Sequence, residues 1–225
     1  MSAAEEFVGR LQRFRKLPGV FNPWRDWDRD NDISRRSREQ RAEHLVHYLR
    51  EREGRARTLL VAEAPGYQGC HFSGIPMTSE RILLGHQVRD GIAASDVILP
   101  AAQQTSRHAE RGVGEPTATV VWKNLKQAGI DTRSVVLWNA FAFHPMADGP
   151  LSNRAPTRDE LKAGRRLLLE CLALFPGARV LPVGRVAEAM LAGLGVECEA
   201  WLRHPARGGA GEFAQGLQAR IARLR

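Results

Sequence analysis

The sequence is poor in cysteine and lysine, and it has no long apolar run. Its three cysteines are far apart and form no Cys-x-x-Cys pair, which argues against a disulfide framework or a four-cysteine metal site. No stretch is apolar enough to span a bilayer, and the first residues lack the apolar core of a secretion signal. We therefore expect a cytoplasmic protein with three reduced thiols, at least two of them buried.

The charge of the chain is strongly positive, with a formal net charge of +8 at pH 7. A basic surface favours a polyanionic partner. Arginine supplies most of the positive charge, and its guanidinium can fork onto phosphate oxygens. High-GC coding produces the same bias, so charge alone leaves nucleic-acid binding and a compositional origin about equally open.

The chain of 225 residues suits one sizeable domain. Continuous apolar runs that end in turn sequences predict buried parallel strands. The strands are expected at 58–62, 134–138, 178–183 and, more weakly, 196–202. Helical patterns alternate with them, at 34–53, 118–127, 157–175, 185–194 and 212–225. Together they predict a single α/β domain with a central four-stranded parallel sheet flanked by helices.

The N-terminal part, residues 1–57, reads as a helical extension of this domain. It begins with a possible capping box from Ser2 to Glu5. Residues 17–33 read as an irregular connection, and His44 reads as a surface residue of the following helix. Farther along the chain, residues 88–116 show little periodicity and are expected to form a long surface excursion.

Three of the four predicted strands end in unusual polar or turn sequences. These are Glu63-Ala-Pro-Gly66, the segment that begins at Asn139, and Arg203-His204-Pro205. The carboxyl ends of parallel strands meet at one rim, where α/β proteins bind ligands. We expect these three segments to converge there.

Two of these side chains could handle a nucleobase. The amide of Asn139 places a hydrogen-bond acceptor beside a donor, which complements the edge of uracil. His204 could donate a hydrogen bond to a departing base that gains negative charge. Each residue taken alone could instead be an ordinary turn residue.

Taken in order, these segments resemble the uracil-DNA glycosylase superfamily over about residues 58–220. The first is similar to the GEAPG motif of the iron–sulfur bacterial enzymes, with Ala62 in place of the first glycine and Gly74-Ile-Pro-Met77 in place of G-x-P-F. Further matches follow along the chain. They are Asn139–Pro145, Asn153–Pro156 with Glu160, Val183–Arg185, and Arg203–Pro205.

The resemblance implies hydrolysis of the N-glycosidic bond of uracil in DNA, which releases free uracil and leaves an abasic site. It implies a monomer that acts on uracil-containing DNA in the bacterial cytoplasm or nucleoid. The expected catalytic residues are His204 and Glu63. The expected uracil-binding residues are Glu63, Ala64, Gly66, Phe72, Met77 and Asn139. Arg81, Arg203 and Arg207 are expected to bind DNA.

Three departures from the family pattern modify these expectations. The cluster-binding cysteines are missing and Phe143 stands at the position of one, so we expect no iron–sulfur cluster, metal or other cofactor. Met77 replaces the phenylalanine that stacks on the base, and either Met77 or Phe72 takes that role. Ala64 stands where the best-known members have a water-orienting aspartate.

Two alternatives to a glycosylase follow from these observations. Because Ala64 lacks a carboxylate, one alternative is a catalytically weak protein of the same fold that binds uracil-containing or abasic DNA. An α/β hydrolase or nucleotide-binding protein would need a G-x-S-x-G elbow or a G-x-x-x-x-G-K loop, and the sequence has neither.

Overall fold

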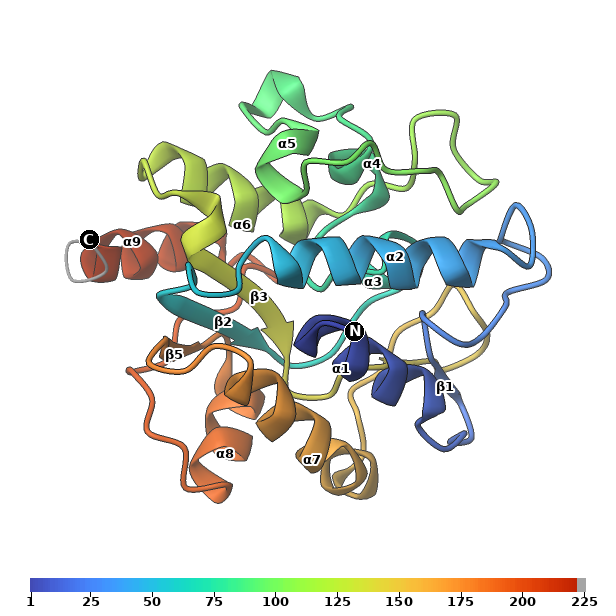
Figure 1. The fold of residues 1–225 in the computed structure, drawn as a ribbon. Helices are drawn as coiled ribbons and strands as arrows, with labels where there is room; N and C mark the ends of the chain where they lie inside the picture. The colour runs from blue at the N-terminus through green and yellow to red at the C-terminus, as the bar shows by residue number, and fades with distance from the viewer. Residues whose placement is uncertain (222–225) are drawn as a thin grey trace.

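Three parallel strands form the centre of the computed structural model, which describes residues 1–221 (Figure 1). They are β2 (Thr58–Ala62), β3 (Val135–Asn139) and β5 (Arg179–Pro182), in the order β3-β2-β5. All residues of β2 and β3 are buried, as expected for a parallel sheet that is covered on both faces. The predicted α/β fold is confirmed, and the strand positions agree with the prediction to within one residue at each end.

The fourth predicted strand, 196–202, is reduced among the described residues to one isolated bridge between Val183 and Leu202. The N–H of Leu202 donates to the carbonyl of Pro182 at 2.7 Å. Pro182 has no N–H to return on that edge of the sheet, so the ladder cannot continue through it. Within residues 1–221 the parallel sheet therefore has three strands rather than four.

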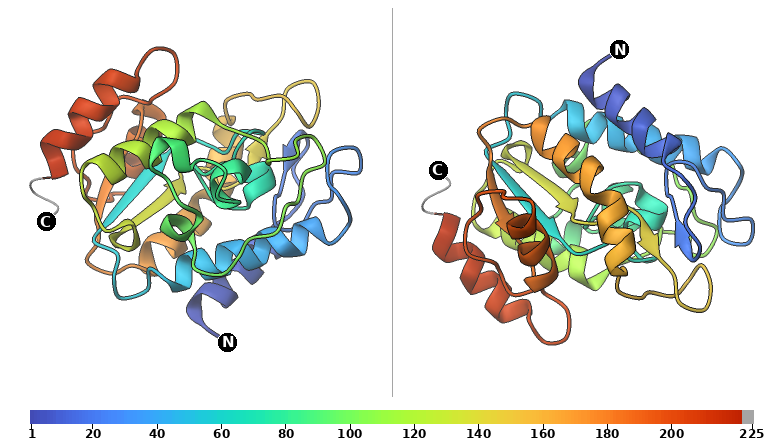
Figure 2. Two further views of the ribbon diagram at one scale, coloured as in Figure 1. Left: turned by 90° about the horizontal axis from the view of Figure 1, so that it is seen from above. Right: turned by 90° about the horizontal axis from the view of Figure 1, so that it is seen from below.

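Helices surround the sheet (Figure 2). The longer ones are α1 (Ala3–Arg13), α2 (Ser37–Arg50), α6 (Pro116–Gln127), α7 (Arg158–Ala173), α8 (Arg185–Gly193) and α9 (Ala210–Ile221). Short elements lie between them: α3 (Cys70–Ser73), α4 (Glu80–Leu83), α5 (Ala94–Val97), η1 (Val88–Asp90) and η2 (Thr132–Ser134). Helix α1 packs against α2 and α7, α6 packs against α9, and α8 packs against β5. In the part of the chain that the structure describes, no helix is both long and apolar enough to cross a membrane.

The N-terminal segment is built into the domain core. The predicted capping box is present, since Ser2 and Glu5 exchange side-chain-to-backbone hydrogen bonds. Phe7 is fully buried and its ring packs against Trp138 of β3 at 5.5 Å. The segment is not purely helical, because it also contributes β1 (Val20–Phe21), which pairs antiparallel with β4 (His144–Pro145).

The excursion at 88–116 is fastened to the domain by the buried carboxylate of Glu80. This carboxylate accepts hydrogen bonds from the backbone N–H groups of Thr105 (2.6 Å), Ser106 (3.0 Å) and Val113 (3.3 Å), and from the hydroxyls of Thr105 and Ser106. Thr105 and Ser106 are fully buried. The prediction of a surface excursion is therefore wrong for this part of the segment.

The prediction of a surface position for His44 is also wrong. Its ring is buried, and burial lowers its pKa to about 4. Nε2 accepts from the backbone N–H of Gln103 at 3.2 Å, so Nδ1 carries the proton and donates to the carbonyl of Ser73 at 3.0 Å. His44 thus ties α2 to two loops.

Candidate active site

The strand ends bring the three sequence motifs to one rim of the sheet. Just after β3, the N–H of Ala140 donates to the carbonyl of Ala62 at 2.7 Å, and the N–H of Phe141 donates to the carbonyl of Glu63 at 3.0 Å. On the other side of β2, the N–H of Gly184 donates to the carbonyl of Leu202 at 2.8 Å. Glu63, Asn139 and the segment before His204 therefore emerge at the same edge, as the parallel topology predicts.

Asn139 is the most unusual polar residue at this rim. It lies opposite Ala62 in the sheet and its side chain is 1% exposed. Neither its Nδ2 nor its Oδ1 has a hydrogen-bond partner within residues 1–221. Leaving one buried polar group unpaired costs about 1–3 kcal/mol. A buried amide with both ends unpaired is what a site needs if a ligand is to supply the partners.

His204 is half-buried on the loop that follows the bridge to β5. Its Nδ1 accepts a hydrogen bond from the backbone N–H of Ala206 at 3.1 Å. Burial lowers the pKa of the ring, and the neighbouring Arg203 lowers it further. The ring is therefore neutral at pH 7, and its proton is on Nε2, which is a donor. A side chain at Gly209 would clash with the carbonyl of His204, so this tight loop requires glycine there.

Glu63 is half-buried directly after β2. Burial raises the pKa of its carboxyl group, while the positive charge of Arg207 acts in the opposite direction. Its side chain makes no hydrogen bond or ion pair to any residue that the structure describes. Glu63 is thus a second side chain at the rim that is available to a ligand or a water.

The loop after Glu63 is held from the side by Asn153. Its Oδ1 accepts from the backbone N–H of Tyr67 at 2.9 Å, and its side chain lies against Gly66. Ala64 is half-buried and packs on the core. The Asn-Arg-x-Pro segment thus supports the first motif.

Residues 51–220 match the sequence profile of the Uracil DNA glycosylase superfamily. The chain belongs to this superfamily. Its fold is similar to the crystal structure of wild-type SMUG2 from Pedobacter heparinus, with a TM-score of 0.67 at 15% sequence identity. That similarity covers 100% of this chain and 98% of the other. No curated protein matches the sequence.

The residues of this glycosylase-family chain do not fit an iron–sulfur cluster. Such clusters are usually held by four cysteine thiolates, and the chain has three cysteines in all. Cys70 and Cys171 are fully buried, and burial raises the pKa of both thiols, which disfavours thiolate. Phe143 stacks on Phe14 at 4.6 Å and fills this part of the core with aromatic packing. The resemblance to the iron–sulfur subgroup stays a prediction.

Both candidates for stacking on the base are buried. Phe72 is 1% exposed in α3, and its ring lies 4.5 Å from that of His71. Met77 is 7% exposed and has a φ of 49°, in the left-handed region that favours glycine. Backbone strain of this kind clusters at ligand sites, which directs attention to Met77 without excluding Phe72.

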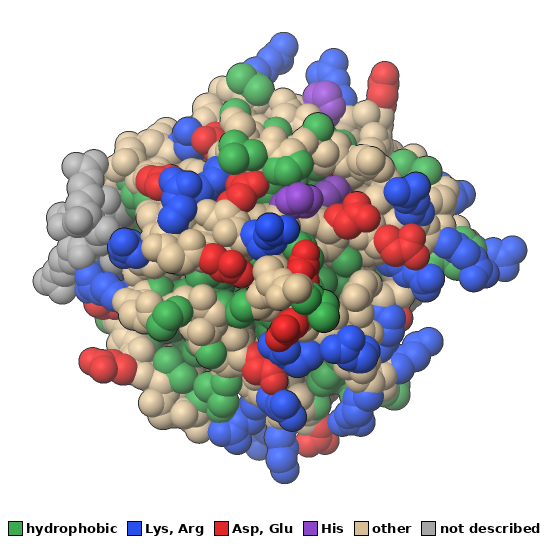
Figure 3. All heavy atoms as spheres, in the orientation of Figure 1, with side chains coloured by type: hydrophobic (Ala, Val, Ile, Leu, Met, Phe, Trp, Pro, Cys, Tyr) green, Lys and Arg blue, Asp and Glu red, His purple; other side chains and the backbone are tan. Residues whose placement is uncertain are grey.

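The three predicted DNA-binding arginines differ in their surroundings. Arg81 is half-buried, and its Nε donates to the carbonyl of Gly112 at 3.3 Å, so it supports that loop. Arg203 is 38% exposed and lies 3.9 Å from Glu212. Arg207 is exposed at the rim with a φ of 52°. On the face drawn in Figure 3, acidic side chains lie among the basic ones, so the positive charge there is not one patch.

A chain of buried polar contacts lies behind the first motif, and no local sequence pattern marks it. The Nε2 of His144 lies 2.8 Å from the carbonyl of Ser152 and 3.1 Å from Oδ1 of Asn153. Its Nδ1 lies 3.0 Å from Nδ1 of His71, whose Nε2 faces Asp28 at 3.2 Å. These contacts connect the N-terminal segment to the side chain that holds the loop after Glu63.

A second missed residue is Glu115, which precedes α6. Its carboxylate packs against Gly69, where a side chain would clash with it. Its Oε2 is buried and without a hydrogen-bond partner in the described part of the chain. Burial raises its pKa to about 7. No local sequence pattern marks this position, because the contact joins residues 46 apart in the chain.

Proposed function

We propose that this protein excises uracil from DNA by hydrolysing the N-glycosidic bond, which yields free uracil and an abasic site. The observation that carries the proposal is the amide of Asn139, which has no hydrogen-bond partner among residues 1–221 and is buried at the rim where the three segments that resemble superfamily motifs meet. Oδ1 can accept from the ring N–H of uracil while Nδ2 donates to the adjacent carbonyl. Cytosine presents the opposite pattern, with an unprotonated ring nitrogen beside an amino group.

The bases of DNA are stacked, so the uracil nucleotide must leave the helix to reach a buried amide. Phosphate contacts would hold the DNA against the rim, with Arg203 and Arg207 as the more exposed candidates and Arg81 as a support for its loop. Met77 or Phe72 would then cover one face of the base, and the loop Glu63–Gly66 would border it.

The two proposed catalytic residues act on opposite charges. As the glycosidic bond breaks, negative charge grows on the base and positive charge on the sugar. His204 is neutral with its proton on Nε2, so it can donate to a uracil carbonyl as that charge develops. Glu63 in its ionised form can hold the water that attacks the sugar. Burial raises the pKa of its carboxyl group, and the positive charge of Arg207 opposes that shift.

The alanine at position 64 is consistent with a second function, which is DNA binding without catalysis. Ala64 supplies no carboxylate at the position where the best-known members of the superfamily orient water, so Glu63 must handle the water alone. If Glu63 did not position the water, the protein would bind uracil-containing or abasic DNA without hydrolysing the glycosidic bond.

One assay separates these functions. An end-labelled oligonucleotide with a single uracil is incubated with the protein and then heated in alkali, in single-stranded and in duplex form. We expect breaks at the uracil position, whereas a shifted but uncut band would identify a binding protein. Hypoxanthine, xanthine and mismatched thymine in the same sequence measure the preference for uracil, and breaks at one of these alone would refute the uracil assignment.

A further inference from the structure

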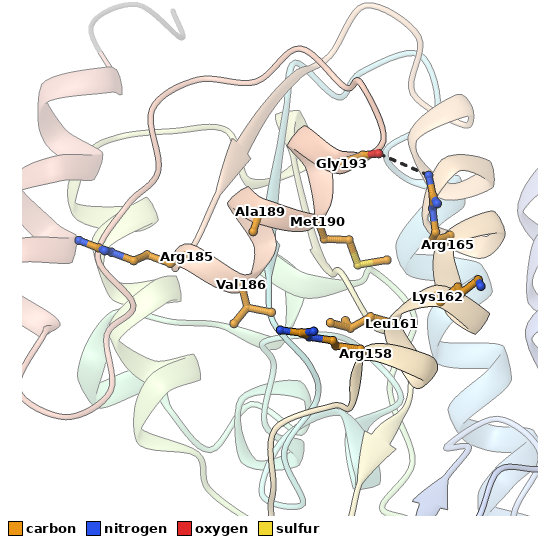
Figure 4. Close-up of a pocket in the computed structure, with 9 residues that line it drawn as sticks. All are labelled: Arg158, Leu161, Lys162, Arg165, Arg185, Val186, Ala189, Met190 and Gly193. Carbon is orange, nitrogen blue, oxygen red and sulfur yellow. Dashed lines mark hydrogen bonds between the residues drawn. The ribbon is translucent and has the colours of Figure 1, made fainter.

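A groove of about 570 Å³ lies between α7 and α8, with no role in the proposed reaction (Figure 4). Each helix contributes one stripe of residues three and four positions apart, so one face of each helix borders the groove. The lining residues are Arg158, Leu161, Lys162, Arg165, Arg185, Val186, Ala189, Met190 and Gly193.

The floor of the groove is apolar. The side chains of Leu161, Val186 and Met190 point into the space between the two helices and are only half-buried. Ala189 adds a small exposed side chain to the same stripe of α8. An occupant that covers this floor would be stabilised by the removal of this apolar surface from water.

The border of the groove is basic, and none of the described residues that line it is acidic. None of its cationic side chains forms an ion pair with another residue of 1–221. The contrast with their neighbour Arg166 is clear, since Arg166 lies outside the groove and pairs with Glu170 at 2.7 Å. The four cationic side chains of the groove are Arg158, Lys162, Arg165 and Arg185.

Two of these cations have other contacts that shape the groove. Arg165 donates to the carbonyl of Gly193 at 3.4 Å, which joins α7 to the end of α8. Arg185 extends away from the space between the helices and lies 5.2 Å from the ring of Trp201. Arg158, which lies beside Val186 and Leu161, is therefore the cation best placed to meet an occupant of the groove, and Lys162 borders the groove from the outer side of α7 (Figure 4).

The combination of an apolar floor with unpaired cations selects the chemistry of the occupant. Nucleic acid would satisfy the cations through its phosphates, but a duplex keeps its bases stacked inside and offers the floor little apolar surface. An acidic peptide with large apolar side chains satisfies both. The stripe from Arg158 to Arg165 extends about 10 Å at roughly 1.5 Å per residue, which about three residues of extended peptide would cover.

We propose that this groove binds a short, extended acidic segment of a partner protein. Large apolar side chains of the segment pack on Leu161, Val186 and Met190, and its carboxylates pair with Arg158 and Lys162. The proposal is independent of the reaction at the sheet rim.

The test uses a fluorescein-labelled peptide of four aspartates followed by Leu-Ala-Phe, titrated with the full-length protein and followed by fluorescence anisotropy. We expect saturable binding that weakens about tenfold, or 1.4 kcal/mol, in Met190→Glu and in Lys162→Glu. Arg166→Glu makes the same charge change next to the groove and should bind like the wild type. Met190→Ala is a milder variant in case Met190→Glu fails to fold. Unchanged excision of uracil by these variants would show that the site at the rim is intact.

Two further peptides separate the contributions of charge and apolar contact. Replacing the aspartates by lysines, or Leu and Phe by serine, should each weaken binding about tenfold. Absence of saturable binding, equal binding of the lysine peptide, or an equal loss in Arg166→Glu would overturn the proposal. So would displacement of the peptide by a single-stranded thymidine oligonucleotide together with loss of DNA affinity in Lys162→Glu, because the groove would then be a nucleic-acid site.

Discussion

Asn139 and Glu80 are both buried polar side chains, yet the protein treats them in opposite ways. Glu80 receives hydrogen bonds from three backbone N–H groups and two hydroxyls. Asn139 receives and donates none among the described residues. A satisfied buried carboxylate stabilises a fold, whereas an unsatisfied amide destabilises it unless a ligand completes it. The comparison thus assigns Glu80 to the structure and Asn139 to the site.

The largest effect is expected at the site, from His204→Ala. Removing a donor to a developing negative charge costs roughly 100- to 1000-fold in rate. Single-turnover excision should fall by that amount while DNA affinity and thermal stability stay close to wild type. The matched control is His47→Ala, because His47 is also a half-buried histidine but lies on α2, away from the motifs. Full turnover by His204→Ala would contradict the assignment.

The next effect should appear at Glu80 as a loss of stability. Glu80→Ala leaves several buried donors unpaired, each at about 1–3 kcal/mol, so we expect a loss of at least about 3 kcal/mol. Urea unfolding measures it, with the exposed Glu43→Ala as the control. The folded fraction should still excise uracil. A Glu80→Ala protein that is stable but inactive would show that Glu80 acts in the reaction and not in stabilising the fold.

Asn139→Leu should give the reverse result in the same unfolding experiment. The substitution removes two unpaired polar atoms from a buried position with little change in volume, so stability should hold or rise by about 1 kcal/mol. A loss of more than 2 kcal/mol, which is a large value for one residue, would show that Asn139 has a structural partner.

The smallest effect concerns pH. Because the pKa of His204 is lowered, its ring should still be mostly neutral at about pH 6.5, where an ordinary histidine is half protonated. Protonation would place a proton on Nδ1 and break the hydrogen bond from Ala206, so the contribution of this loop to stability is lost as the pH falls through the lowered pKa. An NMR titration of the ring gives the midpoint, and a midpoint above 6.5 would contradict the neutral donor.

The strands and the rim could be predicted from the sequence because their pattern is local. Continuous apolar runs mark β2, β3 and β5, and the polar residues after them locate the rim. The fourth strand was overpredicted, since its apolar pattern does not show that the neighbouring Pro182 lacks the N–H that a ladder needs.

The supports of the site could not be predicted in this way. His44 contacts Ser73 and Gln103, and His144 contacts His71, across separations of 29 to 73 residues. Contacts at such distances leave no periodic trace in the sequence. The same holds for the missing partners of Asn139, because only the packed structure shows that no other residue of 1–221 hydrogen-bonds to its amide.

The central claim is that the amide of Asn139 recognises uracil, and single-turnover excision by Asn139→Asp beside the wild type tests it most directly. The carboxylate keeps the size of the side chain but replaces its donor by a negatively charged acceptor. We predict alkali-labile breaks at uracil with the wild type and a rate about 100-fold lower, or 2.7 kcal/mol, with Asn139→Asp. Equal rates for the two proteins would contradict the account.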